Sequence, residues 1–173
     1  WFALLCAVTA FLCFRCLGVK AIDSWDEARH GISAYEMLKN KQFLVNTYLG
    51  KPDYWNVKPP LSFLSVAAGF VLCGYNAVGL RFFSALFYLL TVIFTGLFAR
   101  KYSHLASLLT MIFLCANYFP FKAHLARAGD ADSLYLLLFT LSMLCMLKVR
   151  DNGRWLYACG LFFSLAFLTK SFH

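Results

Sequence analysis

Long runs without a charged side chain alternate with short polar links along most of the chain. Residues 1–19 contain only Arg15, and four further runs contain no charge at all: 82–99, 105–121, 133–147 and 155–169. A helix needs about 20 mostly apolar residues to cross the roughly 30 Å apolar core of a bilayer, and interfacial residues complete the shorter runs. In that core only helices and closed barrels satisfy every backbone hydrogen bond. The pattern therefore predicts an all-α integral membrane protein, a multi-span bundle with spanning helices over about these five runs.

Residues 20–60 form a long polar segment that carries eleven charged side chains. The sequence Ser24-Trp25-Asp26-Glu27 has the form of a capping box, which predicts a helix from there to about Asn40. Its apolar residues gather on one side, so we expect this helix to lie along the membrane surface. From Phe43 to Lys58 the pattern is extended, and Pro59-Pro60 open another helix. Because binding and catalytic residues concentrate in such loops, this segment is where chemistry is expected.

The next segment, 61–80, is uncharged throughout, but its strongly apolar part is the fifteen-residue stretch Leu61–Tyr75. That stretch is short for a span, so an interfacial helix over about 60–75 is the alternative to a further spanning helix. The choice decides whether the loops that hold Asp26 and Asp132 face the same side. The positive-inside rule leaves both topologies open, because the basic residues of two links share a side in either one: Arg100, Lys101, Lys148, Arg150 and Arg154.

The composition agrees with a membrane protein. Hydrophobic residues make up 61% of the 173 residues, aromatic residues 18% and charged residues 14%, and the mean hydropathy is +0.66. These values exclude a water-soluble globule, a disordered chain and a coiled coil. The formal net charge of +8 comes from basic residues that lie between the apolar runs without forming a stripe, so no nucleic acid partner is expected.

The seven cysteines fall in or beside the apolar runs. Cys13 and Cys16 form a C-x-x-C, but no second Cys or His pair accompanies them, so all seven are interpreted as small buried apolar groups. The chain begins at Trp1 without a basic leader and ends at His173 just after an apolar run. We therefore expect it to be a piece of a longer protein, with its first apolar run as a retained span.

The eight acidic residues all lie in the polar segments. None falls in a predicted span, which argues against a proton or ion pathway and so against a transporter. Asp26 falls in the first turn of its helix, where the helix dipole favours the ionised carboxylate, and Arg29 and His30 share its face. Such a carboxylate suits a general base that acts near a phosphate. The alternative, that these acids only start the helix, stays open for Asp26 and is preferred for Glu27.

Further candidates for phosphate or metal binding follow along the chain. Lys58 stands before two prolines at a helix start, where it suits a phosphate oxygen or, alternatively, snorkels to the interface. Arg127 has three interpretations: it binds phosphate, it pairs with a neighbouring Asp, or it lies in a solvated loop. Asp130 and Asp132 have the D-x-D spacing of oxygen ligands for a divalent cation, a signal that also arises by chance. His124 is interpreted as an interfacial histidine.

An ordered set of short motifs runs through nearly the whole chain. It comprises Trp25-Asp26-Glu27-Ala28-Arg29-His30, Tyr35-Glu36-Met37-Leu38, Gly50-Lys51-Pro52, Lys58-Pro59-Pro60-Leu61, Gly79-Leu80-Arg81, Ala126-Arg127 with Gly129-Asp130-Ala131-Asp132, and Leu165-Ala166-Phe167-Leu168-Thr169-Lys170. In order and spacing this set resembles the amino-terminal portion of the GT-C membrane glycosyltransferases of the protein mannosyltransferase and lipid A aminoarabinose transferase type.

The resemblance implies an enzyme that moves a sugar from a polyprenyl-phosphate donor to a lipid, glycan or protein acceptor. It implies a GT-C bundle with juxtamembrane helices in the first extracytoplasmic loop, and it places 59–75 beside the membrane. The expected location is the inner membrane of a bacterium, with the site facing the periplasm. The alternatives are a non-catalytic membrane subunit and a lipid or small-molecule transporter.

The resemblance also implies roles for single residues. The catalytic Asp of the family's Asp-Glu pair falls on Asp26, and a second acidic position falls on Asp132 rather than Asp130. The family's groups near phosphate fall on Lys58 and Arg29. The reaction implied is a single inverting displacement, in which Asp26 removes the acceptor proton while cations neutralise the departing phosphate. The remaining candidates for substrate or phosphate binding are His30, Glu27, Arg127 and Asp130.

One position departs from the motif. The aminoarabinose transferases have a Glu immediately before the Lys-Pro, where this chain has Val57. The resemblance therefore assigns no metal ligand there, and a divalent metal is left open as a cofactor. The same departure leaves the sugar open.

Overall fold

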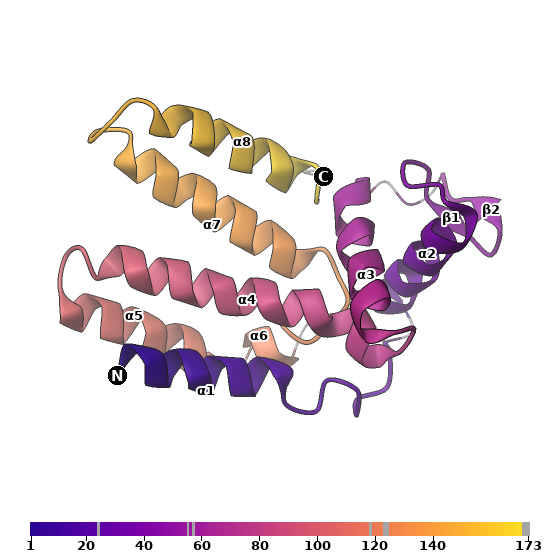
Figure 1. Ribbon diagram of the computed structural model, residues 1–173, viewed down its shortest axis with the longest axis horizontal. Coiled ribbons are helices and arrows are strands. Elements are labelled where there is room, and N and C mark those ends of the chain that lie inside the picture. The colour runs from indigo at the N-terminus through magenta and orange to yellow at the C-terminus, as the bar shows by residue number, and fades with distance from the viewer. Residues whose placement is uncertain (24, 55, 57, 118, 123–124, 171–173) are drawn as a thin grey trace.

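The computed structural model describes residues 1–23, 25–54, 56, 58–117, 119–122 and 125–170. Ser24, Val57 and His124 therefore lie outside the described residues. Helices that run side by side make an elongated bundle (Figure 1). They are α1 (Phe2–Phe14), α4 (Ala77–Ala99), α5 (His104–Ala116), α7 (Asp132–Lys148) and α8 (Trp155–Phe167).

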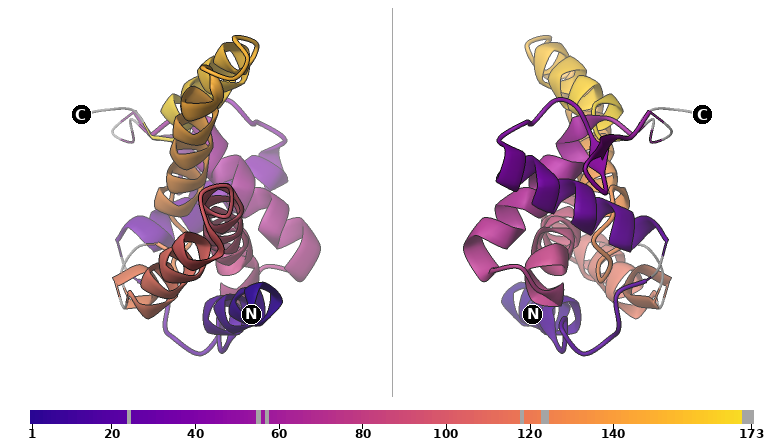
Figure 2. Two further views of the ribbon diagram at one scale, coloured as in Figure 1. Left: turned by 90° about the vertical axis from the view of Figure 1, so that its left-hand side faces the viewer. Right: turned by 90° about the vertical axis from the view of Figure 1, so that its right-hand side faces the viewer.

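The two ends of the bundle differ in what covers them. At the end here named the α2 end, α1 and α8 finish, α4 and α7 begin, and the helices α2 (Asp26–Asn40) and α3 (Pro60–Cys73) lie across the bundle (Figure 1). Viewed from that side, α2 and α3 stand in front of the bundle helices (Figure 2, right). At the opposite end, here named the basic end, the links 100–103 and 149–154 join α4 to α5 and α7 to α8. The loops that hold Asp26 and Asp132 thus share the α2 end.

The bundle helices are shorter than some of the apolar runs. In the described part of the chain, α4 with 23 residues is the one helix both long and apolar enough to cross a membrane, while α1, α3, α5 and α8 are apolar but shorter. The helix expected over 1–19 ends at Phe14, because Arg15 leaves the helical conformation and Cys16 has a positive φ of 54°. The helix expected over 105–121 ends at Ala116, since Asn117 is extended. The membrane spans themselves stay a prediction.

Helix α4 begins five residues earlier than the uncharged run from 82 indicates. Its start is fixed by Asn76, whose side-chain oxygen accepts a hydrogen bond of 2.9 Å from the Gly79 N–H. The first turns therefore include Arg81, a charged residue that the charge-free window excluded. Arg81 is 1% exposed and bonded to protein groups on all sides, which is why a helix interior accommodates its charge.

Helix α3 is held tightly against α4. Pro60 lies in its first turn, and Gly74 ends it with a positive φ of 83°. A Cβ on Gly69 would clash with the carbonyl oxygen of Gly79, so the two glycines set how closely the helices approach. Between α2 and α3, the short strands β1 (Thr47–Tyr48) and β2 (Lys51–Pro52) pair as a hairpin, as the extended pattern around Gly50 indicates.

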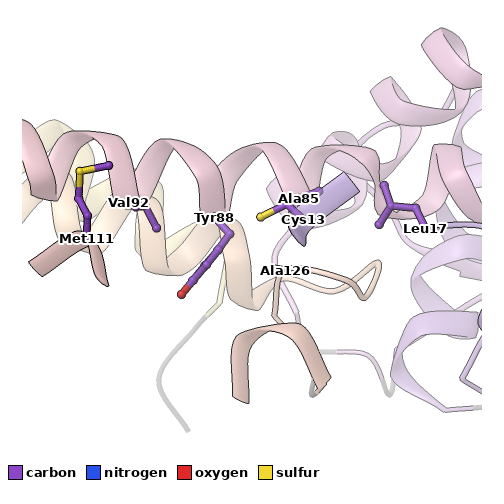
Figure 3. Packing of buried hydrophobic residues seen from close by; sticks show 7 residues of the cluster. All are labelled: Cys13, Leu17, Ala85, Tyr88, Val92, Met111 and Ala126. Atoms are coloured by element: carbon purple, nitrogen blue, oxygen red, sulfur yellow. The ribbon is translucent and has the colours of Figure 1, made fainter. Parts of the chain in front are cut away.

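A buried apolar cluster joins the bundle helices α1, α4 and α5 (Figure 3). Tyr88 on α4 is 1% exposed, and its hydroxyl donates a hydrogen bond of 2.8 Å to the carbonyl of Leu114 on α5. The cluster also contains Cys13 and Met111. Cys13 and Cys145 are buried as expected for apolar cysteines, whereas Cys16 is exposed at the turn after α1. This packing fixes the α2 end, where α1 finishes and α4 starts.

Candidate active site

Lys58 links two acidic groups from distant parts of the chain. Its Nζ lies 3.2 Å from Oδ1 of Asp26 and 3.2 Å from Oδ1 of Asp130. The Asp26 side chain is 39% exposed, whereas that of Asp130 is 5% exposed. The ammonium group is therefore shared by one open carboxylate and one buried carboxylate.

The start of α2 positions Asp26. The residue is the first of the helix, where the unpaired N–H groups and the helix dipole favour an anion. The Asp26 carbonyl accepts a hydrogen bond of 3.0 Å from Nδ1 of His30, one turn later. The carbonyl of Asp26 is thus held by His30, while its carboxylate reaches solvent.

His30 is packed beneath the acidic pair. Its ring stacks on Phe63 of α3 with centroids 4.5 Å apart, and Nδ1 lies 3.6 Å from Oδ1 of Asp130. Burial is the largest influence and lowers the pKa of His30, and the opposing charge of Asp130 does not reverse the shift. Since the Asp26 carbonyl can only accept, Nδ1 of His30 is the donor in the hydrogen bond between them. Its Nε2 is buried without a hydrogen-bond partner among the described residues.

Asp130 is kept ionised in spite of its burial. Burial alone would raise the pKa of Asp130, but His30, the Lys58 ammonium and a 2.7 Å hydrogen bond from the Ala131 N–H hold it below its ordinary value. It therefore supplies a fixed negative charge to Lys58.

Glu27 points away from Asp26 and into the protein. Its carboxylate is paired at two points with Arg81 of α4, at 2.6 Å from Nε and 2.8 Å from Nη2. It also accepts hydrogen bonds of 2.8 Å from the Asp23 N–H and 2.9 Å from the Gly129 N–H. Burial alone would raise the pKa of Glu27, but these partners hold it below its ordinary value. Glu27 thus ties the start of α2 to α4 and to the loop that carries Asp130.

Arg81 completes this connection. Its guanidinium donates hydrogen bonds to three carbonyls of the link between α1 and α2: Leu17 at 2.7 Å, Lys20 at 2.8 Å and Ala21 at 3.0 Å. The helix begins at Asp26 with Trp25 at its N-cap, and the N–H that donates to Glu27 belongs to Asp23, so this bond is not the return bond of the capping box predicted from Ser24. Ser24 itself lies outside the described residues.

Arg29 pairs with a third acidic residue. Its Nη2 lies 2.9 Å and 3.0 Å from the two carboxylate oxygens of Asp53, and its guanidinium stands 5.5 Å from the centre of the Tyr48 ring. Asp53 and Lys58 line one pocket of about 310 Å³, together with Asn46 and other residues of the hairpin region. Arg29 therefore supports the wall of a pocket that reaches Lys58.

Asp132 has a lysine of its own. It is the first residue of α7, and its Oδ1 lies 2.6 Å from Nζ of Lys170, just after α8. Burial alone would lower the pKa of Lys170, but Asp132, with the nearby charges of Asp130 and Asp26, holds it above its ordinary value. A second cation thus stands at the α2 end beside the Asp26, Lys58 and Asp130 cluster.

Arg127 lies outside this cluster. Its Nη2 donates hydrogen bonds of 2.8 Å and 3.1 Å to the carbonyls of Arg15 and Cys16, so it fastens the loop before α7 to the end of α1. The D-x-D pair also separates, because Asp130 turns to Lys58 and Asp132 to Lys170. Within the described ranges, no three His, Cys, Asp or Glu side chains gather as a metal site.

The family model of dolichyl-phosphate-mannose-protein mannosyltransferases matches residues 57–173. The chain belongs to this mannosyltransferase family. Membership confirms the resemblance that the motifs indicate, and it covers Lys58, Asp130, Asp132 and Lys170 in a single match.

Single proteins are also similar to this chain. An uncharacterized protein of Aquifex aeolicus (strain VF5) is 33% identical over 144 residues, which make up 82% of this chain and 28% of that protein. The crystal structure of ArnT from Cupriavidus metallidurans in the apo state superposes with a TM-score of 0.85 at 24% identity. The crystal structure of ArnT from Cupriavidus metallidurans bound to undecaprenyl phosphate superposes with a TM-score of 0.81 at 22% identity. Both alignments cover 98% of this chain and 32% of the ArnT chain, so this chain spans about a third of the length of ArnT. At these identities the similarity shows the fold alone.

The expectations from the sequence differ from the structure mainly in which charged side chains form pairs. The structure joins Asp26, Lys58 and Asp130 with His30 beneath them, and it adds Lys170, a residue for which the motifs predict no role. The motifs likewise predict no role for Arg81. The sequence signal for Lys170 and Arg81 is a basic residue in or beside an uncharged run, where its charge needs a buried or interfacial partner.

Proposed function

We propose that the protein containing this chain is a polyprenyl-phosphate-dependent glycosyltransferase, with its active centre at Asp26 and Lys58. The observation that carries the proposal is the Lys58 ammonium, held 3.2 Å from an open and a buried carboxylate. Membership of the mannosyltransferase family supports it. So does the shared fold with ArnT, a protein crystallised with undecaprenyl phosphate. The acceptor is a lipid, glycan or protein hydroxyl or a phosphate.

Lys58 serves as the cation for the donor phosphate. Its partner Asp130 is buried and remains bound, while its partner Asp26 is exposed and can be exchanged for a phosphate oxygen. Binding of the donor would thus release the Asp26 carboxylate at the moment when an anion takes its place. Held cations of this kind stabilise the charge that develops on the departing phosphate.

Asp26 serves as the general base. The acceptor oxygen forms a bond to the anomeric carbon as the bond from that carbon to the phosphate oxygen breaks, and the acceptor proton moves to Asp26. The electron pair of the broken bond stays on the polyprenyl phosphate, which leaves as an anion. The displacement inverts the anomeric carbon and needs no general acid.

The other residues take supporting roles in this proposal. Asp132 holds Lys170 as a second cation toward the phosphate, and His30 keeps Asp130 in place. Arg29 supports the pocket beside Lys58. Glu27, through Arg81, positions the two loops rather than touching the substrate, and Arg127 does the same for the loop before α7.

The charges support a site on the side of the membrane opposite the cytoplasm, which is the periplasm in the bacterial inner membrane that the resemblance implies. The basic end carries Arg100, Lys101, Lys148, Arg150 and Arg154, and such links face the cytoplasm in membrane proteins. The α2 end then faces the opposite side. A polyprenyl donor anchored in that leaflet would present its phosphate at the level of Lys58.

The test uses the full-length protein in detergent with labelled polyprenyl-phosphate mannose and polyprenyl-phosphate aminoarabinose. We expect turnover of one donor, with an inverted anomeric configuration in the product. Replacement of Lys58 by Met should lower that turnover about 10²-fold to 10³-fold, while the exposed Lys51→Met variant keeps it. Absence of turnover with every polyprenyl-phosphate sugar and acceptor would contradict the proposal, and so would a product of retained configuration.

A further inference from the structure

A groove at the basic end, far from Lys58, has the chemistry of a lipid site. The groove has a volume of about 380 Å³ and is bounded by α4, α7 and α8. Its walls are apolar, with Phe94 and Leu97 from α4 and Leu141 from α7 among them. Two lysines also line it, Lys101 just after α4 and Lys148 in the last turn of α7. The groove thus combines an apolar wall with two ammonium groups.

The two lysines are held by rings instead of carboxylates. Nζ of Lys148 lies 4.3 Å from the centre of the Trp155 ring, and Nζ of Lys101 lies 5.8 Å from that of Phe98. In the part of the chain that the structure describes, neither lysine forms an ion pair. This differs from the α2 end, where Lys58 and Lys170 both contact aspartates. The charges at the groove are left for an external anion.

The surroundings reinforce this positive field. The links 100–103 and 149–154, together with Lys148, contain five basic residues and one acid, Asp151. A head group with a net negative charge is attracted there, whereas a zwitterionic head group brings a cation that these residues repel. Trp155, the first residue of α8, also lines the groove, and tryptophan is enriched at membrane interfaces.

The groove also has the right direction for an acyl chain. From Lys148 its α7 wall continues to Leu141, seven residues deeper, which is about 10 Å along a helix. A phosphate between the two ammonium groups would therefore leave a fatty acyl chain along Leu141 and Leu97. We propose that this groove binds one anionic phospholipid, such as phosphatidylglycerol, from the leaflet at the basic end.

The proposal goes beyond the glycosyltransferase function and does not depend on it. Native mass spectrometry of the full-length protein with added phosphatidylglycerol should show one retained lipid. In the Lys101→Gln/Lys148→Gln variant we expect retention to fall about tenfold. The matched Lys39→Gln/Lys41→Gln variant, which removes two exposed lysines near the end of α2, should retain the lipid. Equal losses in both variants, no loss in the first, or equal retention of phosphatidylcholine by the wild type would each overturn the proposal.

A cross-link identifies what occupies the groove. With p-benzoylphenylalanine in place of Leu97, irradiation in membranes should yield an adduct whose mass is that of an anionic phospholipid. An adduct to another segment of the same polypeptide would show that a helix of the remaining protein fills the groove, and it would overturn the proposal. An adduct to zwitterionic lipid in proportion to its abundance would do the same.

Discussion

Glu27 on α2 and Arg81 on α4 form a buried ion pair at two points, 54 residues apart in the sequence. The side chains are 2% and 1% exposed. Both also bind backbone groups of other segments, so that the link after α1, the start of α2 and the loop before α7 meet on one pair. The position of Asp26 relative to Asp130 follows from this connection.

Removal of one member of the pair should destabilise the protein strongly. A lone buried charge is left behind, and breaking such a pair costs about 3 to 5 kcal/mol. We expect Arg81→Met of the full-length protein to lose about that much stability, measured by denaturant unfolding in detergent. The combined Arg81→Met/Glu27→Gln variant should lose less than the sum of the two single changes. Arg100→Met, at the exposed basic end, is the control. A loss from Arg81→Met no larger than that of Arg100→Met would contradict the role given to the pair.

The burial of His30 predicts a loss of stability in mild acid. The folded state holds the pKa of His30 below the unfolded value of about 6.5, so the unfolded state takes up a proton that the folded state refuses. The contribution of His30 to the free energy of unfolding is therefore complete above about pH 6.5, and it falls as the pH decreases toward the pKa of His30 in the folded state. Between pH 7.5 and 5.5 the melting temperature of the wild type should fall more than that of His30→Asn. The exposed His104→Asn variant should follow the wild type, and a parallel decline in all three proteins would refute the assignment.

Lys58 should matter for the donor more than for the fold. It is 23% exposed, and its buried partner Asp130 keeps the hydrogen bond from the Ala131 N–H when the ammonium group is removed. We expect Lys58→Met to lower the transfer rate about 10²-fold to 10³-fold, the cost of removing one preorganised group that stabilises the leaving oxygen. Lys58→Arg should recover part of the rate, because the charge returns with a different shape. Steady-state kinetics with a labelled donor measures this effect, and a rate within twofold of the wild type in Lys58→Met would count against it.

Asp132 and Lys170 should act as a unit. Their charged atoms lie 2.6 Å apart, so that loss of either one removes the ordered cation. The combined Asp132→Asn/Lys170→Met variant should then transfer sugar about as slowly as either single variant, since residues that act together are not additive. If the loss of transfer rate in the double variant equalled the product of the two single losses, the two residues would have independent roles, and this prediction would be wrong.

The sequence predicts the parts of this site whose cause is local. The helix from Asp26 to Asn40 follows from its acidic first turn and its apolar face, and the helix at Pro60 follows from the two prolines before Leu61. Helices α7 and α8 lie close to their uncharged runs because charged residues bound them at both ends. The early end of α1 at Phe14 was not predicted, since hydropathy alone does not register the turn at Cys16.

The pairing of charges depends on contacts that are distant in sequence. Lys58 meets Asp26 and Asp130 across 32 and 72 residues, and Arg81 meets Glu27 across 54. Hydropathy places these residues at ends of helices, but which cation meets which acid depends on how α2 and α3 lie across the bundle. For the same reason, the sequence alone does not show that Asp130 and Asp132 turn to different lysines.

Transfer by an Asp26→Asn variant tests the central claim most directly. The full-length variant should keep the melting temperature of the wild type and bind the donor, but transfer sugar about 10²-fold to 10⁴-fold more slowly, because the acceptor proton has no base to receive it. Asp151→Asn, at the basic end, serves as the matched control and should transfer at the wild-type rate. Normal transfer by Asp26→Asn would contradict the assignment of the base and with it the proposed mechanism.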